Sequence, residues 1–421
     1  MDNYATSPAR PRLHEIDFVR GVALFGILVV NLPYYGLPLE VASGVPALND
    51  GPGLLAWGFA NSLFEFKFVS LFSLLFGMSL ILQRDSLVRR RGHWLAALLR
   101  RQGFLLLIGL VHGVVLFQFD ILLPYAILGT IALVAFTLPT RVTVAIAVSL
   151  LALSILLSAR GEIIDTMKQT REPVGLTPLQ EPLKLDNLLP NDTRSLGSIE
   201  LSVFRNGPPW AAFVVRGSEY GFWLYASTLT SGFNARVLAL MLLGILLMRR
   251  HVLDERWRLA RRKLCVAGWL IGLPLELGSA ALLALNPERA LPARIAIETA
   301  HGIGSLALAA GFATALVAWA QSSFASSVRA WIATAGRMAF TNYLAQSMIA
   351  NLIFAGVGLA WYGQLNRMEL LGCAIVVYAA QVATSRIWLA RFEMGPLEWI
   401  WRCVTHLRRL QIRTNLAPRP S

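Results

Sequence analysis

Stretches of about 20 apolar residues recur along most of this chain, and they restrict its fold more than any other feature. One of them, from Phe18 to Leu32, lies close to the amino terminus. A membrane-spanning helix needs such a length because lipid leaves every backbone amide to be satisfied within the segment. Of all residues, 56% are hydrophobic and 15% charged, against about 45–50% and about 25% in soluble domains. The sequence therefore predicts an all-α, polytopic membrane protein.

The apolar segments predict about ten transmembrane helices. They cover residues 18–32, a run ending at 83, and then 95–117, 121–138, 142–157, 233–248, 264–285, 299–321, 333–359 and 370–389. A polar stretch separates an amino-terminal helical half, residues 1–158, from a carboxyl-terminal helical half, residues 221–421. We expect residues 159–220 to form an extracytoplasmic loop, either a small lid-like domain or a functional loop.

The formal net charge of +14 comes from basic residues that gather between apolar segments, as in Arg249–Lys263. Short cytoplasmic loops of membrane proteins carry such an excess of Lys and Arg. This placement argues against nucleic acid as a partner and favours membrane lipids. It also predicts that both termini lie in the cytoplasm, which requires an even number of spans.

The sequence lacks the usual motifs of soluble enzymes and metal sites. It holds no GxxxxGK[ST] phosphate loop, no HExxH pair and no GxSxG turn. Cys265, Cys373 and Cys403 lie in or beside apolar segments without CxxC spacing, which argues against a disulfide framework or a zinc site. We therefore expect no metal and no tightly bound cofactor.

Polar residues at the start of the first two segments are the first candidates for function. Asp17, Arg20 and Asn31 fall on one face of a helix at about 100° per residue. They form either an ion pair at the cytoplasmic interface or a polar stripe that lines a cavity. Glu65 and Lys67 precede the second apolar run, and we expect a simple interfacial pair there.

The third segment holds a histidine, His112, within GLVHG, and Asp120 follows closely. Gly109 and Gly113 form a GxxxG motif, which favours close helix packing, so His112 is either a packed residue satisfied by a neighbouring helix or a general base. Asp120 is then the group that orients the base or accepts a proton. Helical spacing offsets the two by about 80°, so we expect a third group or water between them.

Later segments add further polar residues. Glu276 lies in the middle of the seventh segment, where a carboxylate must be protonated, paired or facing water. The ninth segment carries Arg337, Thr341, Asn342 and Gln346 at helical spacing. We expect the polar residues of the first, third and ninth segments to line one shared, hydrated cavity.

Five motifs resemble those of the YeiB-like family of bacterial inner-membrane proteins and occur in the same order. They are RLHEIDFVRGVALFGILVVN, LFSLLFG, GLVHG followed by FDILLPYAILG, GRMAFTNYLAQS and GPLEWIWR. The resemblance covers nearly the whole chain outside residues 159–219. It implies a multi-pass protein of the bacterial inner membrane whose carboxyl-terminal half is a domain of unknown function.

The amino-terminal half is also similar, more distantly, to the transmembrane acyltransferases that include the lysosomal heparan glucosaminide N-acetyltransferase. This similarity implies acyl transfer from cytoplasmic acyl-CoA to an acceptor on the far side. That enzyme's pattern has a histidine in the outer loop after the first helix, whereas residues 32–53 contain none here. Either His112 takes the role of the base, or the chemistry has changed or been lost.

The leading hypothesis is therefore acyl transfer onto an envelope glycan, lipid or small molecule, with acyl-CoA as cosubstrate. Arg20, Arg101 and Arg337 would hold its phosphates, His112 would be the base and Asn31 would help to stabilise the oxyanion. Two other hypotheses compete with it. One is a transporter or exporter that uses the polar stripes as a solute pathway and the carboxylate of the seventh segment for proton coupling. The other is a membrane scaffold without catalysis.

The distribution of basic residues gives a topology that reporter fusions can test. Fusions after Lys263 and after Ser421 should both report the cytoplasm, and a fusion after Asp192 should report the far side of the membrane. An extracytoplasmic signal at Ser421 would contradict an even number of spans.

Overall fold

The chain is a bundle of helices in the computed structural model, which describes residues 14–89, 92–169, 196–286 and 290–413. Within these ranges the one strand-like feature is an isolated bridge between Phe392 and Arg413, so the all-α prediction is confirmed. The helices up to the middle of the chain are α1 (His14–Gly36), α2 (Leu39–Ser43), α3 (Gly51–Leu63), α4 (Lys67–Arg89), α5 (Trp94–Val115), α6 (Leu122–Ala132), η1 (Leu133–Phe136) and α7 (Thr140–Gln169). Those that follow are α9 (Leu196–Asn206), α10 (Pro209–Leu229), α11 (Phe233–Arg249), η3 (Glu255–Trp257), α12 (Arg258–Leu285), α13 (Leu291–Gln321), α14 (Ser326–Arg337), α15 (Ala339–Phe354), α16 (Arg367–Leu389) and α17 (Pro396–His406).

Seven helical stretches among the described residues are long and apolar enough to cross a membrane. They are His14–Gly36, Gly51–Arg89, Trp94–Val115, Thr140–Ile163, Glu255–Leu285, Leu291–Gln321 and Arg367–Leu389. Helices α10 and α11 pass the same test as a pair bent by 65°, which raises the number to eight. The multi-pass prediction is confirmed, with seven or eight candidate spans in place of about ten.

Three predicted segments do not form a span of their own. Residues 121–138 form α6 and η1, a shorter apolar stretch of Leu122–Phe136. Residues 233–248 form α11, which qualifies only together with α10. Residues 333–359 are divided between α14 and α15 at Met338, whose φ of −112° and ψ of 30° are not helical. Hydropathy measures apolar content and is blind to such breaks, so it overcounts spans.

The predicted polar loop at 159–220 is largely helical where the structure describes it. Helix α7 continues to Gln169, α9 follows, and α10 begins at Pro209. Residues 170–195 lie outside the described residues. Helix α10 contacts both α5 and α11.

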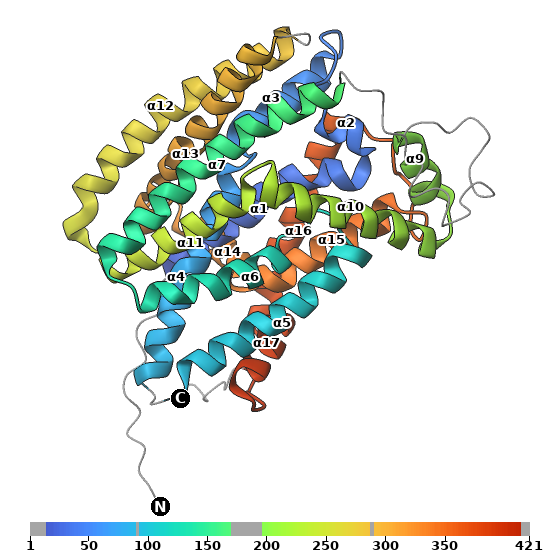
Figure 1. Ribbon diagram of the computed structural model, residues 1–421. Helices are drawn as coiled ribbons and strands as arrows, with labels where there is room; N and C mark the ends of the chain where they lie inside the picture. Colours follow the sequence, from blue (N-terminus) through green and yellow to red (C-terminus); the bar gives the residue numbers. More distant parts are fainter. Residues whose placement is uncertain (1–13, 90–91, 170–195, 287–289, 414–421) are drawn as a thin grey trace, which may run out of the picture.

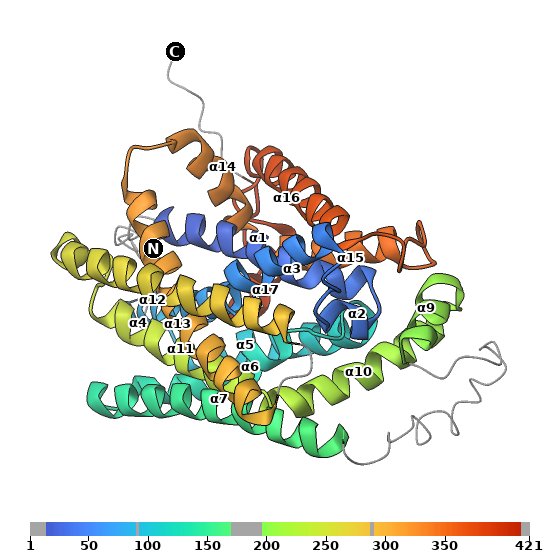
Figure 2. The ribbon, with the colours of Figure 1, turned by 90° about the horizontal axis from the view of Figure 1, so that it is seen from above.

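Helix α1 runs through the middle of the bundle in both views (Figure 1, Figure 2). It contacts α4, α13, α14, α15 and α16. Phe18, Leu24, Leu28 and Leu32 of this helix are at most 2% exposed, so the apolar core is centred on it. Helices α12 and α13 pack together on one flank, whereas α5, α6 and α17 lie on another (Figure 1).

Helices α4 and α11 approach so closely that only glycine fits at their contact. A Cβ atom added at Gly77 would lie 2.0 Å from the carbonyl oxygen of Met241, and one at Gly244 would lie 2.1 Å from that of Leu74. Small residues allow this approach between helices in lipid, where dispersion contacts replace the hydrophobic effect.

Gly77→Ala should therefore destabilise the protein, because the added methyl group meets backbone and overpacking costs about 1–3 kcal/mol. The measurement is thermal unfolding of the purified protein in detergent. Gly103→Ala is the matched control, since a Cβ atom there has nothing within 4 Å. Equal melting temperatures for the two variants would contradict the close contact.

Candidate functional site

Three buried side chains from three parts of the chain meet inside the bundle. His112 lies in the last turn of α5, Asp120 just before α6, and Ser347 on α15. Nδ1 of His112 is 2.7 Å from Oδ1 of Asp120, and Nε2 is 2.7 Å from Oγ of Ser347. None of the three residues is more than 1% exposed. A carboxylate, an imidazole and a hydroxyl in this order form the hydrogen-bonded chain of a Ser–His–Asp triad.

The chain reverses direction between α5 and α6, and this turn brings Asp120 back to His112. Oδ2 of Asp120 accepts the backbone N–H of Leu123 at 3.0 Å, within the first turn of α6. Gly109 lets α6 approach, because a Cβ atom there would lie 2.3 Å from the nitrogen of Leu123. The expectation of a third group between His112 and Asp120 was wrong. The angular offset of about 80° assumed one continuous helix, but α5 ends at Val115, before Asp120.

One face of α15 carries polar residues one turn before and one turn after Ser347. Tyr343, Ser347 and Asn351 follow each other at intervals of four residues. The hydroxyl of Tyr35, from α1, donates to Oγ of Ser347 at 2.6 Å. The ring of Tyr343 lies 5.2 Å from that of His112, centroid to centroid. If Nδ1 of His112 carries the proton that Asp120 accepts, Nε2 accepts from the Ser347 hydroxyl, which itself accepts from Tyr35 and lies 3.4 Å from the Tyr343 carbonyl oxygen.

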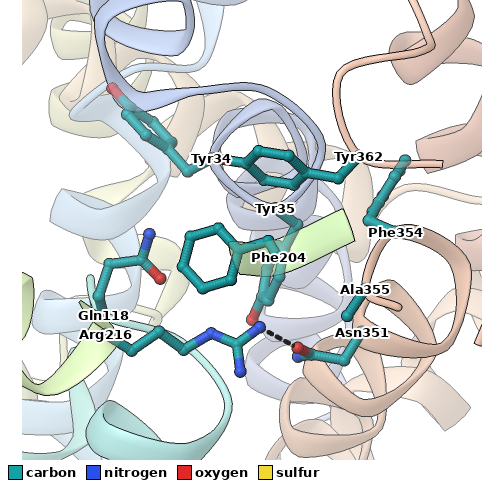
Figure 3. A pocket seen from close by; sticks show the side chains of 9 residues that line it. All are labelled: Tyr34, Tyr35, Gln118, Phe204, Arg216, Asn351, Phe354, Ala355 and Tyr362. Carbon is teal, nitrogen blue, oxygen red and sulfur yellow. Dashed lines mark hydrogen bonds between the residues drawn. The ribbon is translucent and has the colours of Figure 1, made fainter. Parts of the chain in front are cut away.

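A small space, here called the outer cavity, lies beside Tyr35 and Asn351 (Figure 3). Its volume of about 10 Å³ suits one water or one hydroxyl group. The Arg216 guanidinium reaches the Asn351 amide oxygen at 2.5 Å, as Figure 3 shows. The residues that line the outer cavity are Tyr34, Tyr35, Gln118, Phe204, Arg216, Asn351, Phe354, Ala355 and Tyr362. Aromatic rings and polar groups therefore surround the space.

A larger space of about 200 Å³, here called the basic cavity, lies at the opposite end of the bundle. It is built where α1 and α5 begin and where α4 and α14 end, together with α17. Its charged lining residues are Asp17, Arg20, Arg101, Arg337, Glu398 and Arg402. Its inner wall is apolar and aromatic, and includes Ile121, Tyr125 and Tyr343. Tyr343 contacts His112, so its ring separates the basic cavity from the triad.

Four predicted site residues meet in the basic cavity: Asp17, Arg20, Arg101 and Arg337. The Arg20 guanidinium donates to Asp17 at 3.1 Å and to the Ser79 hydroxyl at 3.1 Å. The predicted ion pair and the predicted cavity lining therefore occur together. His112 does not line this cavity.

Arg101 and Arg337 of the basic cavity are each held by one contact, the first with an aromatic ring and the second with the backbone. The Arg101 guanidinium lies 3.6 Å from the centre of a Trp401 ring, a cation–π contact. Arg337 donates to the carbonyl oxygen of Glu393 at 2.9 Å. Both contacts involve the carboxyl-terminal segment, which therefore helps to shape the cavity.

Glu398 of α17 joins the carboxyl-terminal segment to the triad helix. Its carboxylate accepts the backbone N–H groups of Phe340 and Thr341 at 2.8 and 3.1 Å, and the Thr341 hydroxyl at 2.5 Å. It therefore caps the start of α15, where backbone donors have no helical partner. Burial raises the pKa of the Glu398 carboxyl above its ordinary value.

The other polar residues predicted for the ninth segment bind neighbouring helices and do not line the basic cavity. Asn342 donates to the Ser385 hydroxyl at 2.9 Å, and Gln346 donates to Gln381 at 2.9 Å, both on α16. Thr341 holds Glu398. The single shared cavity predicted for three segments is thus realised only in part.

Glu276 belongs to a separate buried cluster formed by α4, α12 and α13. Its carboxylate accepts a hydrogen bond from the Lys67 ammonium and lies 3.0 Å from Nδ1 of His301. The expected pair of Glu65 with Lys67 was wrong, because Glu65 binds the Asn61 amide at 2.5 Å. Side chains of Lys67 and Glu276 are both fully buried, so each charge needs the other.

Sequence reasoning missed Ser347, Tyr35 and Glu398 as members of the site. Ser347 carried one usable signal, its spacing of four residues from Tyr343 and Asn351. Asn31 was predicted to help stabilise the oxyanion, and no hydrogen bond joins it to His112 or Ser347 among the described residues. It lies one turn before Tyr35 on α1.

Comparison with known proteins relates this chain to bacterial proteins that are described as uncharacterized. A family model described as "Protein of unknown function (DUF418)" matches residues 247–408. The chain is 30% identical over 410 residues to "Uncharacterized protein YeiB" of Escherichia coli strain K12, covering 93% of this chain and 95% of that one. It is 26% identical over 413 residues to "Uncharacterized protein YxaH" of Bacillus subtilis strain 168, covering 97% of each. No solved structure matches it.

The buried cluster at Glu276 leads to a stability prediction. Lys67→Met should destabilise the protein by about 3–5 kcal/mol, because it leaves a buried carboxylate without its ammonium partner. Thermal unfolding in detergent is the measurement. The double variant Lys67→Met, Glu276→Met should recover most of the loss, since both members of the buried ion pair are then removed together. A double variant as unstable as the single one would show that the two groups do not form a pair.

Proposed function

We propose that this chain, which belongs to the YeiB family of multi-pass membrane proteins, is a membrane-embedded acyltransferase. It moves an acyl group from cytoplasmic acyl-CoA to an extracytoplasmic acceptor, which is an envelope glycan, a lipid or a small molecule. The observation that carries the proposal is the position of the His112–Asp120 pair between the basic cavity and the outer cavity. Transfer across a membrane needs a base that two substrates reach from opposite sides.

The basic cavity suits the acyl donor. Four arginines, Arg20, Arg101, Arg337 and Arg402, line it beside two carboxylates. Arginines bind phosphate groups through strong, charge-assisted hydrogen bonds. The nucleotide of acyl-CoA would stay at these arginines on the cytoplasmic side, while the thioester end enters the apolar inner part. Acyl-CoA is then a cosubstrate that binds and leaves in each turnover.

The triad suits the proton transfer that acyl transfer requires. A proton on Nδ1 of His112 donates to Asp120, which leaves Nε2 as the basic nitrogen. A hydroxyl or amine that attacks a thioester must lose its proton, and a positioned imidazole contributes about 10²–10⁴-fold to such a step. The Tyr343 ring has to move aside before a thioester reaches this nitrogen.

The outer cavity suits the reacting group of an acceptor. Its volume admits one hydroxyl group, and the polar groups of Gln118, Arg216 and Asn351 can orient it. Only the reacting group of the acceptor would enter, and the rest would remain outside. With bacterial relatives along its whole length, the protein would act in the bacterial inner membrane.

A transporter is the second candidate, and one observation favours it. Lys67, Glu276 and His301 form a buried cluster of protonatable groups, which is what proton coupling requires. This cluster is separate from the triad. Glu276 lines neither the basic nor the outer cavity, however, so the cluster has no pathway beside it among the cavities described here. The same cluster also has a purely structural role as a buried ion pair.

The test of acyl transfer uses sealed membrane vesicles with the cytoplasmic face outward, supplied with radiolabelled acetyl-CoA. We expect the wild-type protein to move label into envelope glycans or lipids. His112→Ala should slow transfer by about 10²–10⁴-fold while acetyl-CoA binding persists, because the base is lost and the arginines remain. Arg337→Ala should weaken acetyl-CoA binding by about tenfold or more.

His251→Ala is the control, since His251 is an exposed histidine in the connection between α11 and α12. Its transfer rate should equal that of the wild type. Transfer at the wild-type rate by His112→Ala would remove this histidine from the mechanism. A wild-type protein that neither binds acyl-CoA nor transfers label, but mediates solute flux in proteoliposomes, would favour the transporter.

A further inference from the structure

Ser347 has the surroundings of a nucleophile, and nothing in the proposed function requires them. Its hydroxyl donates to Nε2 of His112 at 2.7 Å and accepts from the Tyr35 hydroxyl at 2.6 Å. A serine bonded to an imidazole that a carboxylate orients is the group that attacks carbonyl carbon in acyl-transfer enzymes. In a general-base mechanism the acceptor would have to displace this hydroxyl from the histidine.

The position of Ser347 between the two cavities is the second observation. Tyr343 lines the basic cavity and Asn351 lines the outer cavity, and both share the face of α15 that carries Ser347. One turn of four residues rises by roughly 6 Å, so the two cavity walls are roughly 12 Å apart along the helix and Ser347 is halfway. Direct attack needs the reacting atoms about 3–3.5 Å apart. An acyl group that stops at Ser347 covers the distance in two short steps.

We propose that Ser347 is the acyl-carrying nucleophile, so that transfer proceeds through a covalent acyl-serine on α15. This inference rests on the proposed acyl transfer and adds its mechanism. In the first step His112 takes the Ser347 proton, Oγ bonds to the thioester carbonyl carbon, and the carbon–sulfur bond breaks. The proton passes from His112 to the departing sulfur, which leaves as free CoA.

The second step reverses the roles at the other cavity. A hydroxyl or amine of the acceptor gives its proton to His112 and bonds to the carbonyl carbon of the acyl-serine. The bond between this carbon and Oγ of Ser347 then breaks, and His112 returns the proton to Oγ. Neither step needs an oxidant, a reductant or a metal, and the serine ends as it began.

Two features of the surroundings support such an intermediate. Tyr343, which precedes Ser347 by one turn of α15, has a buried hydroxyl with no hydrogen-bond partner of normal geometry among the described residues. It can donate to the oxyanion that forms in each step. Ser347 is 1% exposed, so water is kept from the ester during the interval between the steps.

The experiment is isotope exchange without any acceptor, which suits a protein whose acceptor is unidentified. Purified protein in detergent or lipid nanodiscs receives acetyl-CoA and radiolabelled free CoA. An acyl-serine makes the first step reversible, so label should appear in acetyl-CoA. Ser347→Ala should lower this exchange by about 10⁴-fold or more. Ser347→Cys should retain measurable exchange through a thioester, since a thiol is also a nucleophile.

Three further measurements make the result decisive. Mass spectrometry of acid-quenched protein should locate an acetyl group on the peptide that holds Ser347. Ser279→Ala is the control for loss of a buried hydroxyl elsewhere, because among the described residues the Ser279 hydroxyl donates to the Ile297 carbonyl, at 3.4 Å, within the α12–α13 pair. Melting temperature and CoA binding of the Ser347 variants should match the wild type, which separates loss of chemistry from loss of fold.

The outcomes distinguish this inference from the proposed function. Wild-type protein that transfers label to envelope material but shows no exchange would overturn the acyl-serine and leave direct transfer in place. Transfer at the wild-type rate by Ser347→Ala, or an acetyl group found on His112, would also overturn it. Absence of both transfer and exchange in the wild type would overturn the acyltransferase itself.

Discussion

The Asp120 carboxylate is fully buried, and its two oxygens serve two different parts of the molecule. One oxygen holds the imidazole of His112, and the other holds the first turn of α6 through the Leu123 amide. Hydrocarbon cannot solvate a carboxylate, so protein groups have to supply its donors: His112 of α5, Leu123 of α6 and, at 3.4 Å, the Tyr220 hydroxyl of α10. The orientation of the imidazole follows from the turn that holds Asp120, and with it the direction in which Nε2 meets Ser347. The geometry of the site is thus set at the turn that joins α5 to α6.

Apolar length was sufficient to predict an all-α membrane protein, and polar residues at or within apolar segments selected His112, Asp120, Arg20 and Arg337, while Arg101 was named with the acyl-CoA hypothesis. Both signals are local, because they depend on residues a few turns apart. Ser347 is 235 residues from His112 in the chain, and Tyr35 is 312 residues from Ser347. Periodicity indicates which face of a helix is polar, but it does not say which other helix that face meets. Only the tertiary structure could therefore identify the complete triad, whereas the sequence alone was enough to select His112 and Asp120.

The same limit explains the residues whose surroundings were mispredicted. The cost of a polar group in lipid indicates that Lys67, Asn342 and Gln346 each need a partner, and each has one. The partners are Glu276 and residues of α16, neither of which is near in sequence. Lys67 does not pair with Glu65, although the two are close in sequence, because the Glu65 carboxylate accepts from the Asn61 amide. Desolvation predicts that a pair exists, and packing decides its members.

The cap that α17 places on α15 has a consequence for the order in which the protein is made. His112 and Asp120 are synthesised early, but Ser347 comes much later, and the helix that carries it is capped by Glu398 still further on. Trp401 and Arg402, from the same late helix, complete the wall of the basic cavity. A ribosome-bound chain that has inserted only its first helices therefore holds two of the three triad residues and a cavity that lacks one wall. Under the proposed function, the triad helix and the basic cavity are complete only once α17 has docked, so a partial chain would lack acyl transfer.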